Sequence, residues 1–491
     1  MSTYSVLIAN RGEIAVRIVR SCHELGFRAV AVYSPVDRRA RHVILSDEAY
    51  ALPGDEPAAS YLNSAALLEI ARRARVNAVH PGYGFLSENP AFAAACQESG
   101  VTFVGPPSSV LAECGDKART RERLVQAGVP VLPGTNAVSD EDARAAAARV
   151  GFPLLIKASG GGGGKGIHLV RSAGELPSML RLARGEARTA FGDDRVYLER
   201  WLPDARHIEV QILADTHGRI AAVGERDCSV QRRHQKLIEE TPAPGLAPSM
   251  QRRLLQAAET GARKLGYVNA GTFEFLVQGD EYYFLEVNAR LQVEHPVTEL
   301  VTGMDLVVQQ FRIARREALS IEVPISPRGH AIECRISAED PHEGFLPSTG
   351  TVGGLAEPGG PGIRVDSALF PGMEVTRYYD PLLAKVIAWG TTRGEALSRM
   401  RQALLETAVG GIATTVPFHL WALNDPAFVA GNHDTRFVRG WDEREPRGDL
   451  IPAVLAAAAF EQAEGRRLRF PPDTRNGGWR RAAKDESVDR F

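Results

Sequence analysis

The sequence has few cysteines and no strong excess of charge of either sign. Its five cysteines, at positions 22, 96, 114, 228 and 334, are widely separated among 491 residues and form no Cys-x-x-Cys pair. This spacing argues against a disulfide framework or a structural zinc site, and we expect buried thiols in a reducing compartment. A formal net charge of -2 gives no reason to propose nucleic acid or an anionic membrane as a partner.

The chain also lacks a secretion signal and a long apolar segment. It enters an apolar stretch at Val6 without a basic region followed by a long apolar one. The longest apolar run near the end, residues 453–460, is too short to cross a bilayer. We therefore expect a soluble cytoplasmic protein. Its composition, 44% apolar and 24% charged, is that of an ordinary globular protein, and its length predicts about three domains.

The first 33 residues predict a strand, a helix and a second strand. Apolar segments at 6–9 and 29–33 flank an amphipathic stretch that ends near Leu25. This order implies a parallel sheet. A further short strand at 78–80 leads into a glycine-rich loop at 81–89, and such loops usually carry ligands. Farther along, the pattern predicts helices over 112–128, 250–265 and 392–406.

A pair of carboxylates lies on a predicted hairpin. Two aromatic and β-branched runs, 272–277 and 282–287, are separated by Gly279-Asp280, so Glu274 is predicted to lie opposite Glu286. Facing carboxylates either lie in solvent, share a proton or bind cations. Oxygen donors with Asn288 nearby suit Mg²⁺ or Mn²⁺. The alternative is an ordinary solvated face of an antiparallel sheet.

Polar residues continue to alternate beyond this hairpin. Drawn as one strand, residues 286–294 place five polar side chains on one face, because side chains alternate with a period of two. These are Glu286, Asn288, Arg290, Gln292 and Glu294. The planar fork of Arg290 matches a planar oxyanion such as bicarbonate.

The densest glycine run, residues 160–164, lies between two apolar segments. A Walker A motif is absent, since Ser159 stands at its first glycine position and Gly166 follows Lys165. The run fits a dinucleotide fingerprint, but a strand instead of a helix follows it. We interpret it as a glycine hairpin whose backbone N–H groups close over phosphates, with Lys157 nearby. A mobile surface linker is the alternative.

Together these elements resemble the ATP-grasp fold, and the finer resemblance is to biotin carboxylases. The matching motifs cover about residues 3–440 and are highly specific. They lie at 9–15, 80–89, 157–166, 225–236, 288–298 and 333–335. The resemblance implies the ATP-dependent component of an acetyl-CoA carboxylase, as in fatty acid biosynthesis, or of another acyl-CoA or pyruvate carboxylase.

The same resemblance implies the fold class and the domains. It predicts an α/β (α+β) protein with a Rossmann-like parallel-sheet domain at 1–113 and an ATP-grasp domain at 114–330. The ATP-grasp domain would include a glycine-loop lid at about 131–201. A mixed-sheet C-terminal domain is expected at 331–440, and a partly disordered tail or linker at 441–491.

Roles for individual residues also follow from the resemblance. The ATP contacts it implies are Lys117, Lys157, Gly162, Gly163, Gly164, Glu199, Leu202, His207, Gln231 and His234. Glu274, Glu286 and Asn288 would bind Mg²⁺ or Mn²⁺. Bicarbonate would be held by Lys236, Arg290, Gln292 and the backbone of Val293. Glu294 would deprotonate it, and Arg335 would stabilise the biotin enolate. Glu88 is expected to have a structural or supporting role.

No biotin-acceptor motif occurs in the chain. None of the six methionines is followed by lysine, so the Ala-Met-Lys-Met sequence of biotin carriers is absent. We therefore expect the biotin carrier and the carboxyltransferase on separate chains, in a homodimer or larger complex. Two alternatives stay open: an ATP-grasp ligase with another nucleophile, such as an amino-acid ligase or a carbamate-forming enzyme, and a catalytically inactive scaffold that docks a carrier.

Overall fold

The computed structural model describes residues 4–159, 167–321 and 325–442. Nearly all of the tail predicted at 441–491 lies outside the described residues, and so do Gly162, Gly163 and Gly164. All five cysteines are free and buried. Within the described ranges, no helix combines the length and apolar character that a membrane crossing requires.

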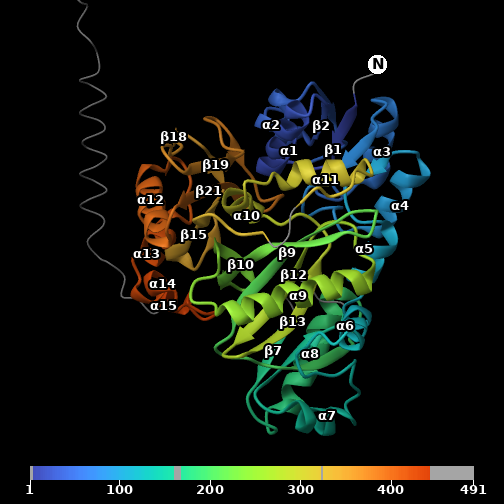
Figure 1. Ribbon diagram of the computed structural model, residues 1–491, viewed down its shortest axis with the longest axis vertical. Coiled ribbons are helices and arrows are strands. Elements are labelled where there is room, and N and C mark those ends of the chain that lie inside the picture. Colours follow the sequence, from blue (N-terminus) through green and yellow to red (C-terminus); the bar gives the residue numbers. More distant parts are fainter. Residues whose placement is uncertain (1–3, 160–166, 322–324, 443–491) are drawn as a thin grey trace, which may run out of the picture. The chain divides into compact units, whose positions relative to one another are not determined.

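The N-terminal part forms a five-stranded parallel sheet in the order β3-β2-β1-β4-β5 (Figure 1). Its strands are β1 (Ser5–Ile8), β2 (Arg28–Tyr33), β3 (Glu48–Ala51), β4 (Ala78–His80) and β5 (Thr102–Phe103). The accompanying helices are α1 (Gly12–Glu24), η1 (Pro35–Asp37), α2 (Arg41–Leu45), α3 (Ser64–Arg73) and α4 (Pro90–Glu98). The predicted strand, helix and strand, and the parallel sheet, are confirmed.

The loops after β1 and β4 contact each other at the carboxyl ends of these neighbouring strands. The Asn10 side-chain amide donates to the carbonyl oxygens of Pro81 (2.6 Å) and Tyr83 (2.8 Å). The order of a parallel sheet reverses at this point, where crevices usually form. Here the two loops are hydrogen-bonded to each other, and the second loop continues to Glu88.

The prediction of one continuous helix over 112–128 is wrong. Two helices occupy the region, α5 (Ser108–Gly115) and α6 (Lys117–Gln126). Asp116 lies between them with extended backbone, and its side chain accepts a hydrogen bond from the Arg119 N–H. A carboxylate that caps a new helix in this way ends the preceding one. The break places Lys117 in the first turn of α6.

A smaller unit has its own sheet and core. It contains α7 (Ala143–Val150), β6 (Leu154–Ala158), β7 (Ile167–Val170), α8 (Leu176–Phe191) and β8 (Val196–Arg200). Strands β6 and β7 are antiparallel, with Leu154 opposite Val170. The prediction of a strand on each side of the glycine run is therefore confirmed. The core of this unit includes Ile156, Leu180 and Leu198.

An eight-stranded antiparallel sheet forms the largest element, in the order β13-β12-β9-β10-β11-β14-β21-β19. Its strands are β9 (Arg206–Ala214), β10 (Ile220–Arg232), β11 (Gln235–Thr241), β12 (Asn269–Gln278), β13 (Glu281–Asn288), β14 (His330–Ser337), β19 (Ile363–Ser367) and β21 (Leu382–Gly390). Helix α9 (Pro248–Leu265) packs across β9 and β10 and confirms the helix predicted at 250–265 (Figure 1). At Gly261 a Cβ atom would lie 2.7 Å from the Phe273 ring, so the close approach of α9 to the sheet requires glycine.

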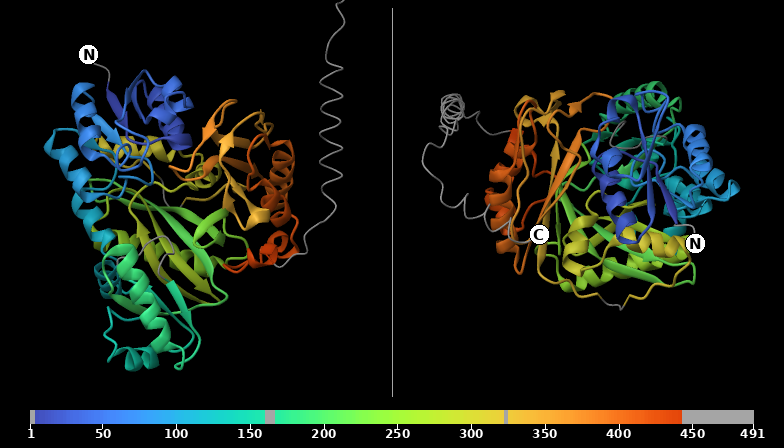
Figure 2. Two further views of the ribbon diagram at one scale, coloured as in Figure 1. Left: turned by 180° about the vertical axis from the view of Figure 1, so that it is seen from behind. Right: turned by 90° about the horizontal axis from the view of Figure 1, so that it is seen from above.

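The remaining helices complete the C-terminal part. Helices α10 (His295–Thr302) and α11 (Leu306–Ala314) precede β14, and α12 (Arg393–Glu406) packs on β21 and β14, as predicted for 392–406. The last helices are α13 (Val416–Ala422), α14 (Pro426–Ala430) and α15 (Arg439–Asp442), and Figure 2 shows them beside the C-terminal strands. Short pieces are β15 (Glu339–Asp340), η2 (Pro341–Glu343), β16 (Leu346–Pro347), β17 (Gly350–Thr351), β18 (Leu355–Ala356), β20 (Glu374–Val375) and β22 (Ala408–Val409).

Candidate active site

A cavity of about 1040 Å³ lies among the small sheet, the strands β9 to β13 and the start of α6. It gathers nearly every described residue that the sequence predicted for the site. Those that line it are Lys117, Lys157, Glu199, Leu202, His207, Gln231, His234, Lys236, Glu274, Glu286, Asn288, Arg290, Gln292, Val293 and Arg335. Glu294 lies beneath the lining and is fully buried.

In the hairpin β12–β13, Glu274 lies directly opposite Glu286 as predicted, but the register near the turn differs by one residue from a fold about Asp280, and a shift between Glu274 and Phe275 restores the pair. Glu274 is buried, which excludes the solvated-face alternative at this position. Cationic groups lie at both carboxylates: Lys236 Nζ is 2.9 Å from Glu274, and Lys117 Nζ is 2.7 Å from Glu286. His207 Nε2 also lies 3.1 Å from Glu274. Each carboxylate therefore has an ammonium partner, and metal binding at this pair stays a prediction.

The predicted strand over 286–294 is wrong beyond Asn288. Strand β13 ends there, residues 289–294 have no regular structure, and Glu294 is the N-cap of α10. Pro296 in the first turn explains the change, because proline fits the start of a helix and cannot donate to a sheet ladder. Arg290 and Gln292 nevertheless line the cavity, since the loop turns them toward it.

Glu294 contacts two cations at once. Its carboxylate accepts from Lys236 Nζ at 2.6 Å and from the Arg335 guanidinium at 2.9 Å. Burial alone would raise the pKa of Glu294, but Lys236, Arg335 and Arg226 lower it well below its ordinary value. The side chain is therefore an ionised carboxylate, the form that can accept a proton.

A second carboxylate, that of Glu239, also bonds Arg335. Glu239 accepts from Arg335 Nε at 2.6 Å and is itself fully buried. Burial raises the pKa of Glu239 to about 7, although Arg335 opposes this change. Two contacts to two carboxylates hold the planar guanidinium in one orientation at the wall of the cavity.

A buried pair, Glu209 and Arg226, supports the site, and the sequence predictions missed both residues. Arg226 Nε donates to Glu209 at 2.5 Å, and Glu209 also contacts Lys236. A usable signal was present in β9, where His207, Glu209 and Gln211 alternate and share one face. Arg226, Glu209 and Gln211 are fully buried and bonded to one another, as buried charges must be.

Arg290 is held in place by side chains and backbone. Its Nε lies 3.0 Å from Glu88, and its terminal nitrogens donate to Asn288 and Gln292, each at 3.1 Å. Glu88 also accepts from the Ala289 N–H at 2.9 Å. Glu88 lines the cavity itself and also bonds the loop that carries Arg290, and its supporting role stays a prediction.

The far side of the cavity combines apolar walls with a charged group. Leu155, Ile167, Leu169 and Leu276 line it beside Glu199, whose carboxylate contacts Lys157 and lies 3.4 Å from Arg121. Arg121 was not predicted. Such a slot, apolar on its faces and polar at one edge, suits a flat ring with hydrogen-bonding groups.

The oxygen atoms at the hairpin fit a hard divalent cation. Among the residues that the structure describes, two tight clusters of metal-binding side chains occur, His207 with Glu209 and Glu274, and Glu209 with Cys228 and Glu294. Glu286 belongs to neither, but it faces Glu274 in the ladder. The carboxylates of Glu274 and Glu286 already attract ammonium groups, and paired carboxylates suit Mg²⁺ or Mn²⁺.

Comparisons with known proteins cover nearly the whole described part of the chain. Residues 2–111 match the family model for the biotin carboxylase N-terminal domain, and residues 333–440 match that for the C-terminal domain. Residues 116–322 match the ATP-binding domain of the carbamoyl-phosphate synthase L chain. Biotin carboxylase 1 of Bacillus subtilis is 47% identical over 442 residues, which cover 89% of this chain and 98% of that protein. The chain belongs to the biotin carboxylase family.

Other members of the biotin carboxylase family serve different carboxylases. A pyruvate carboxylase component from Methanothermobacter thermautotrophicus is 46% identical, over 88% of this chain and 89% of that one. A solved structure of the biotin carboxylase domain dimer of Hydrogenobacter thermophilus 2-oxoglutarate carboxylase, in complex with MgADP, ADP and bicarbonate, has a TM-score of 0.86 and 43% identity. It covers 91% of this chain and all of that one. The predicted ATP-grasp biotin carboxylase fold is confirmed.

Proposed function

We propose that this chain carboxylates biotin, using ATP and bicarbonate, as the first half-reaction of a biotin-dependent carboxylase. The observation that carries the proposal is the simultaneous contact of Glu294 with Lys236 and Arg335 (2.6 and 2.9 Å). It joins a proton acceptor, an anion-binding cation and a guanidinium at one wall of the nucleotide-sized cavity.

Bicarbonate binds where the positive groups converge. Arg290 presents a planar fork, Lys236 a point charge, and Gln292 and the Val293 backbone complete the site. Glu294 removes the bicarbonate proton once Lys236 turns toward the bicarbonate oxygens, because the pKa of Glu294 then rises from the low value that the neighbouring cations impose. The deprotonated oxygen attacks the γ-phosphate of ATP, the bond to the bridging oxygen of the β-phosphate breaks, and carboxyphosphate and ADP are formed.

The nucleotide occupies the opposite side of the cavity. Its adenine ring fits the apolar slot with Glu199 and Leu202 at the edge, and Lys117, Lys157, His207, Gln231 and His234 contact the rest of the nucleotide. Gly162, Gly163 and Gly164, which lie outside the described residues, are further proposed contacts of the nucleotide. Glu274, Glu286 and Asn288 hold Mg²⁺ or Mn²⁺, which neutralises charge on the phosphates when it is bound.

Biotin accepts the carboxyl group beside Arg335. Carboxyphosphate yields CO₂ and phosphate in the site, the released phosphate takes the N1 proton of biotin, and the guanidinium stabilises the resulting enolate, whose N1 captures the CO₂. The two contacts of Arg335 with Glu239 and Glu294 keep the guanidinium facing this position. A guanidinium that is already oriented stabilises the developing charge without reorganisation during the reaction.

The biotin that reacts is carried by a separate protein, and a separate carboxyltransferase completes the reaction. This chain holds no Ala-Met-Lys-Met acceptor. The final acceptor is acetyl-CoA, another acyl-CoA or pyruvate, and the protein works as a homodimer or within a larger complex. The names of its relatives include both biotin carboxylases and a component of a pyruvate carboxylase.

The decisive test is transfer of labelled carbon. Purified protein incubated with Mg·ATP, ¹⁴C-bicarbonate and free biotin should form acid-labile carboxybiotin, and omission of ATP should abolish it. ATP-dependent ligation of an amine or amino acid without carboxybiotin would favour the other ATP-grasp ligases. Absence of ATP turnover, even with a biotinylated carrier, would favour the scaffold alternative.

A further inference from the structure

Lys385 is a fully buried cation that the proposed reaction does not use. It lies in β21, and its Nζ donates to the carbonyl oxygen of Val293 at 2.9 Å. Two buried carboxylates balance its charge, Glu13 at 3.2 Å and Asp366 at 3.8 Å. Burying an ammonium group costs several kcal/mol unless it is paired with a charge and hydrogen-bonded, and Lys385 meets both conditions.

Three separate parts of the chain meet at Lys385. In the sheet it pairs with Arg335 of β14 on one side and with Asp366 of β19 on the other. Glu13 comes from the first turn of α1, in the N-terminal part. Val293 belongs to the irregular segment after β13. Lys385 thus lies opposite the biotin-facing Arg335 in the sheet and also bonds the loop that carries Glu294.

The segment 289–294 depends on such contacts because it has no strand or helix of its own. Side chains bond its backbone at both ends: Glu88 accepts from the Ala289 N–H, His295 bonds the Gln292 carbonyl at 2.8 Å, and Lys385 donates to the Val293 carbonyl. The Val293 carbonyl belongs to the peptide group that leads into Glu294. A fixed peptide group here also fixes the position of the Glu294 Cα, from which the side chain extends.

We propose that Lys385 is a positioning residue that sets the place of Glu294 between Lys236 and Arg335. This inference rests on the proposed function, in which Glu294 removes the bicarbonate proton. A displacement of about 1 Å is enough to cost roughly 100-fold in rate when a reacting group is held by short hydrogen bonds. Lys385 itself touches no substrate, so its loss should act on the bicarbonate step and leave nucleotide binding in place.

The test substitutes Lys385→Met, which keeps the length of the side chain and removes its charge. Wild-type protein is assayed first for bicarbonate-dependent carboxybiotin formation, so failure of the proposed function is seen there and separately. We expect kcat/KM for bicarbonate to fall by about tenfold or more, with KM for ATP changed by less than about twofold. Bicarbonate kinetics equal to those of wild type would overturn the proposal.

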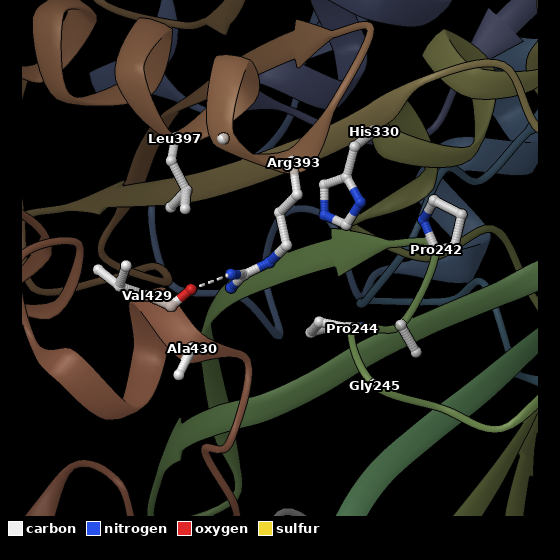
Figure 3. A pocket seen from close by; sticks show the side chains of 10 residues that line it. Pro242, Pro244, Gly245, His330, Arg393, Leu397, Val429 and Ala430 are labelled. Atoms are coloured by element: carbon white, nitrogen blue, oxygen red, sulfur yellow. Dashed lines mark hydrogen bonds between the residues drawn. The ribbon is translucent and has the colours of Figure 1, made fainter.

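Arg393→Met provides a matched control. Arg393 pairs with the buried carboxylate of Glu240 at 2.7 Å and donates to the Val429 carbonyl at 2.7 Å, so it too joins a buried carboxylate to a backbone carbonyl. It lines a separate cavity of about 530 Å³ and contacts no residue of segment 289–294 in the described structure (Figure 3). Its loss should lower the thermal midpoint without changing KM for bicarbonate. A parallel fall in bicarbonate kinetics in both variants would overturn the proposal.

A double variant separates positioning from folding. Lys385→Met with Glu13→Gln removes a carboxylate that the single change leaves without its cationic partner, and neutral replacement of a buried ion pair often preserves stability. The Val293 carbonyl still lacks its donor, so the bicarbonate defect should persist in a protein with a thermal midpoint close to that of wild type. Recovery of wild-type bicarbonate kinetics in the double variant would show that Lys385 acts only on stability and would overturn the proposal.

Discussion

Glu294 lies 2.9 Å from the guanidinium of Arg335, although 41 residues separate them in the chain. Glu294 begins α10 and Arg335 lies in β14, so the contact joins two elements of different parts of the fold. In the proposed reaction these residues serve the two successive steps, proton removal from bicarbonate and stabilisation of the biotin enolate. Their contact places both steps at one point.

Arg335→Ala separates these steps. Biotin carboxylation should fall by about 100-fold or more, because a preorganised donor to the developing charge is lost. Some bicarbonate-dependent ATP hydrolysis should remain, since Arg290 and Lys236 still bind the anion. The measurement compares carboxybiotin formation with ADP release in the same samples. Equal loss of both activities would refute this division of roles, and Arg72→Ala, which removes an exposed arginine paired with Glu69, serves as the control.

Glu274→Gln should weaken the use of metal and of ATP together. The amide keeps the shape of the side chain but removes the charge that attracts the cation. We expect the Mg²⁺ concentration for half-maximal ADP release to rise by about tenfold, accompanied by a higher KM for Mg·ATP. Glu281→Gln is the matched control, because Glu281 lies on the same hairpin and is exposed. An unchanged metal requirement would remove Glu274 from the metal site.

Arg290→Lys tests the shape of the anion site instead of its charge. Lysine keeps the positive charge but loses the planar fork and the contacts with Glu88, Asn288 and Gln292. The KM for bicarbonate should increase by about tenfold, with little change in the KM for ATP. Steady-state ADP release at varied bicarbonate measures this. Wild-type bicarbonate affinity in the lysine variant would mean that Arg290 contributes only charge, or nothing, to binding.

The hairpin and the parallel sheet were predictable because local patterns determine them. The turn at Gly279-Asp280 indicates the hairpin, but by itself it would pair Glu274 with Leu285, and the register shift between Glu274 and Phe275 places Glu274 opposite Glu286. The alternating polar residues of 289–294 favour a strand, but Pro296 starts a helix and Glu294 caps it. Alternation predicts a strand only where a partner strand is present.

The buried partners of the site could not be read from the sequence in the same way. Glu239 and Lys385 each lie on a strand, and each contacts a charged group far away in the chain, Arg335 for Glu239 and Glu13 for Lys385. Only the order of the sheet brings these strands together. Most site residues that were predicted came from motifs of the biotin carboxylase family, and the assignment of their roles remains a prediction.

The raised pKa of Glu13 predicts that the stability of the protein falls as pH rises toward neutrality. Burial raises its pKa from 4.5 to about 7, although Lys385 opposes this change. Between pH 4.5 and pH 7, Glu13 is deprotonated in the unfolded chain but still protonated in the folded one. The free energy of unfolding should therefore decrease as pH rises from about 4.5 to about 7, by roughly 3 kcal/mol from this group. Glu13→Gln should reduce that decrease, measured by chemical unfolding at both pH values. The same decrease in the variant and in wild type would exclude Glu13 as its source.

ADP release by the purified protein with Mg·ATP, with and without bicarbonate and free biotin, measures the proposed reaction itself. We expect turnover that biotin stimulates and that disappears when bicarbonate is removed. Turnover that is independent of bicarbonate, or indifferent to biotin, would contradict the proposed reaction and indicate another ATP-dependent ligase.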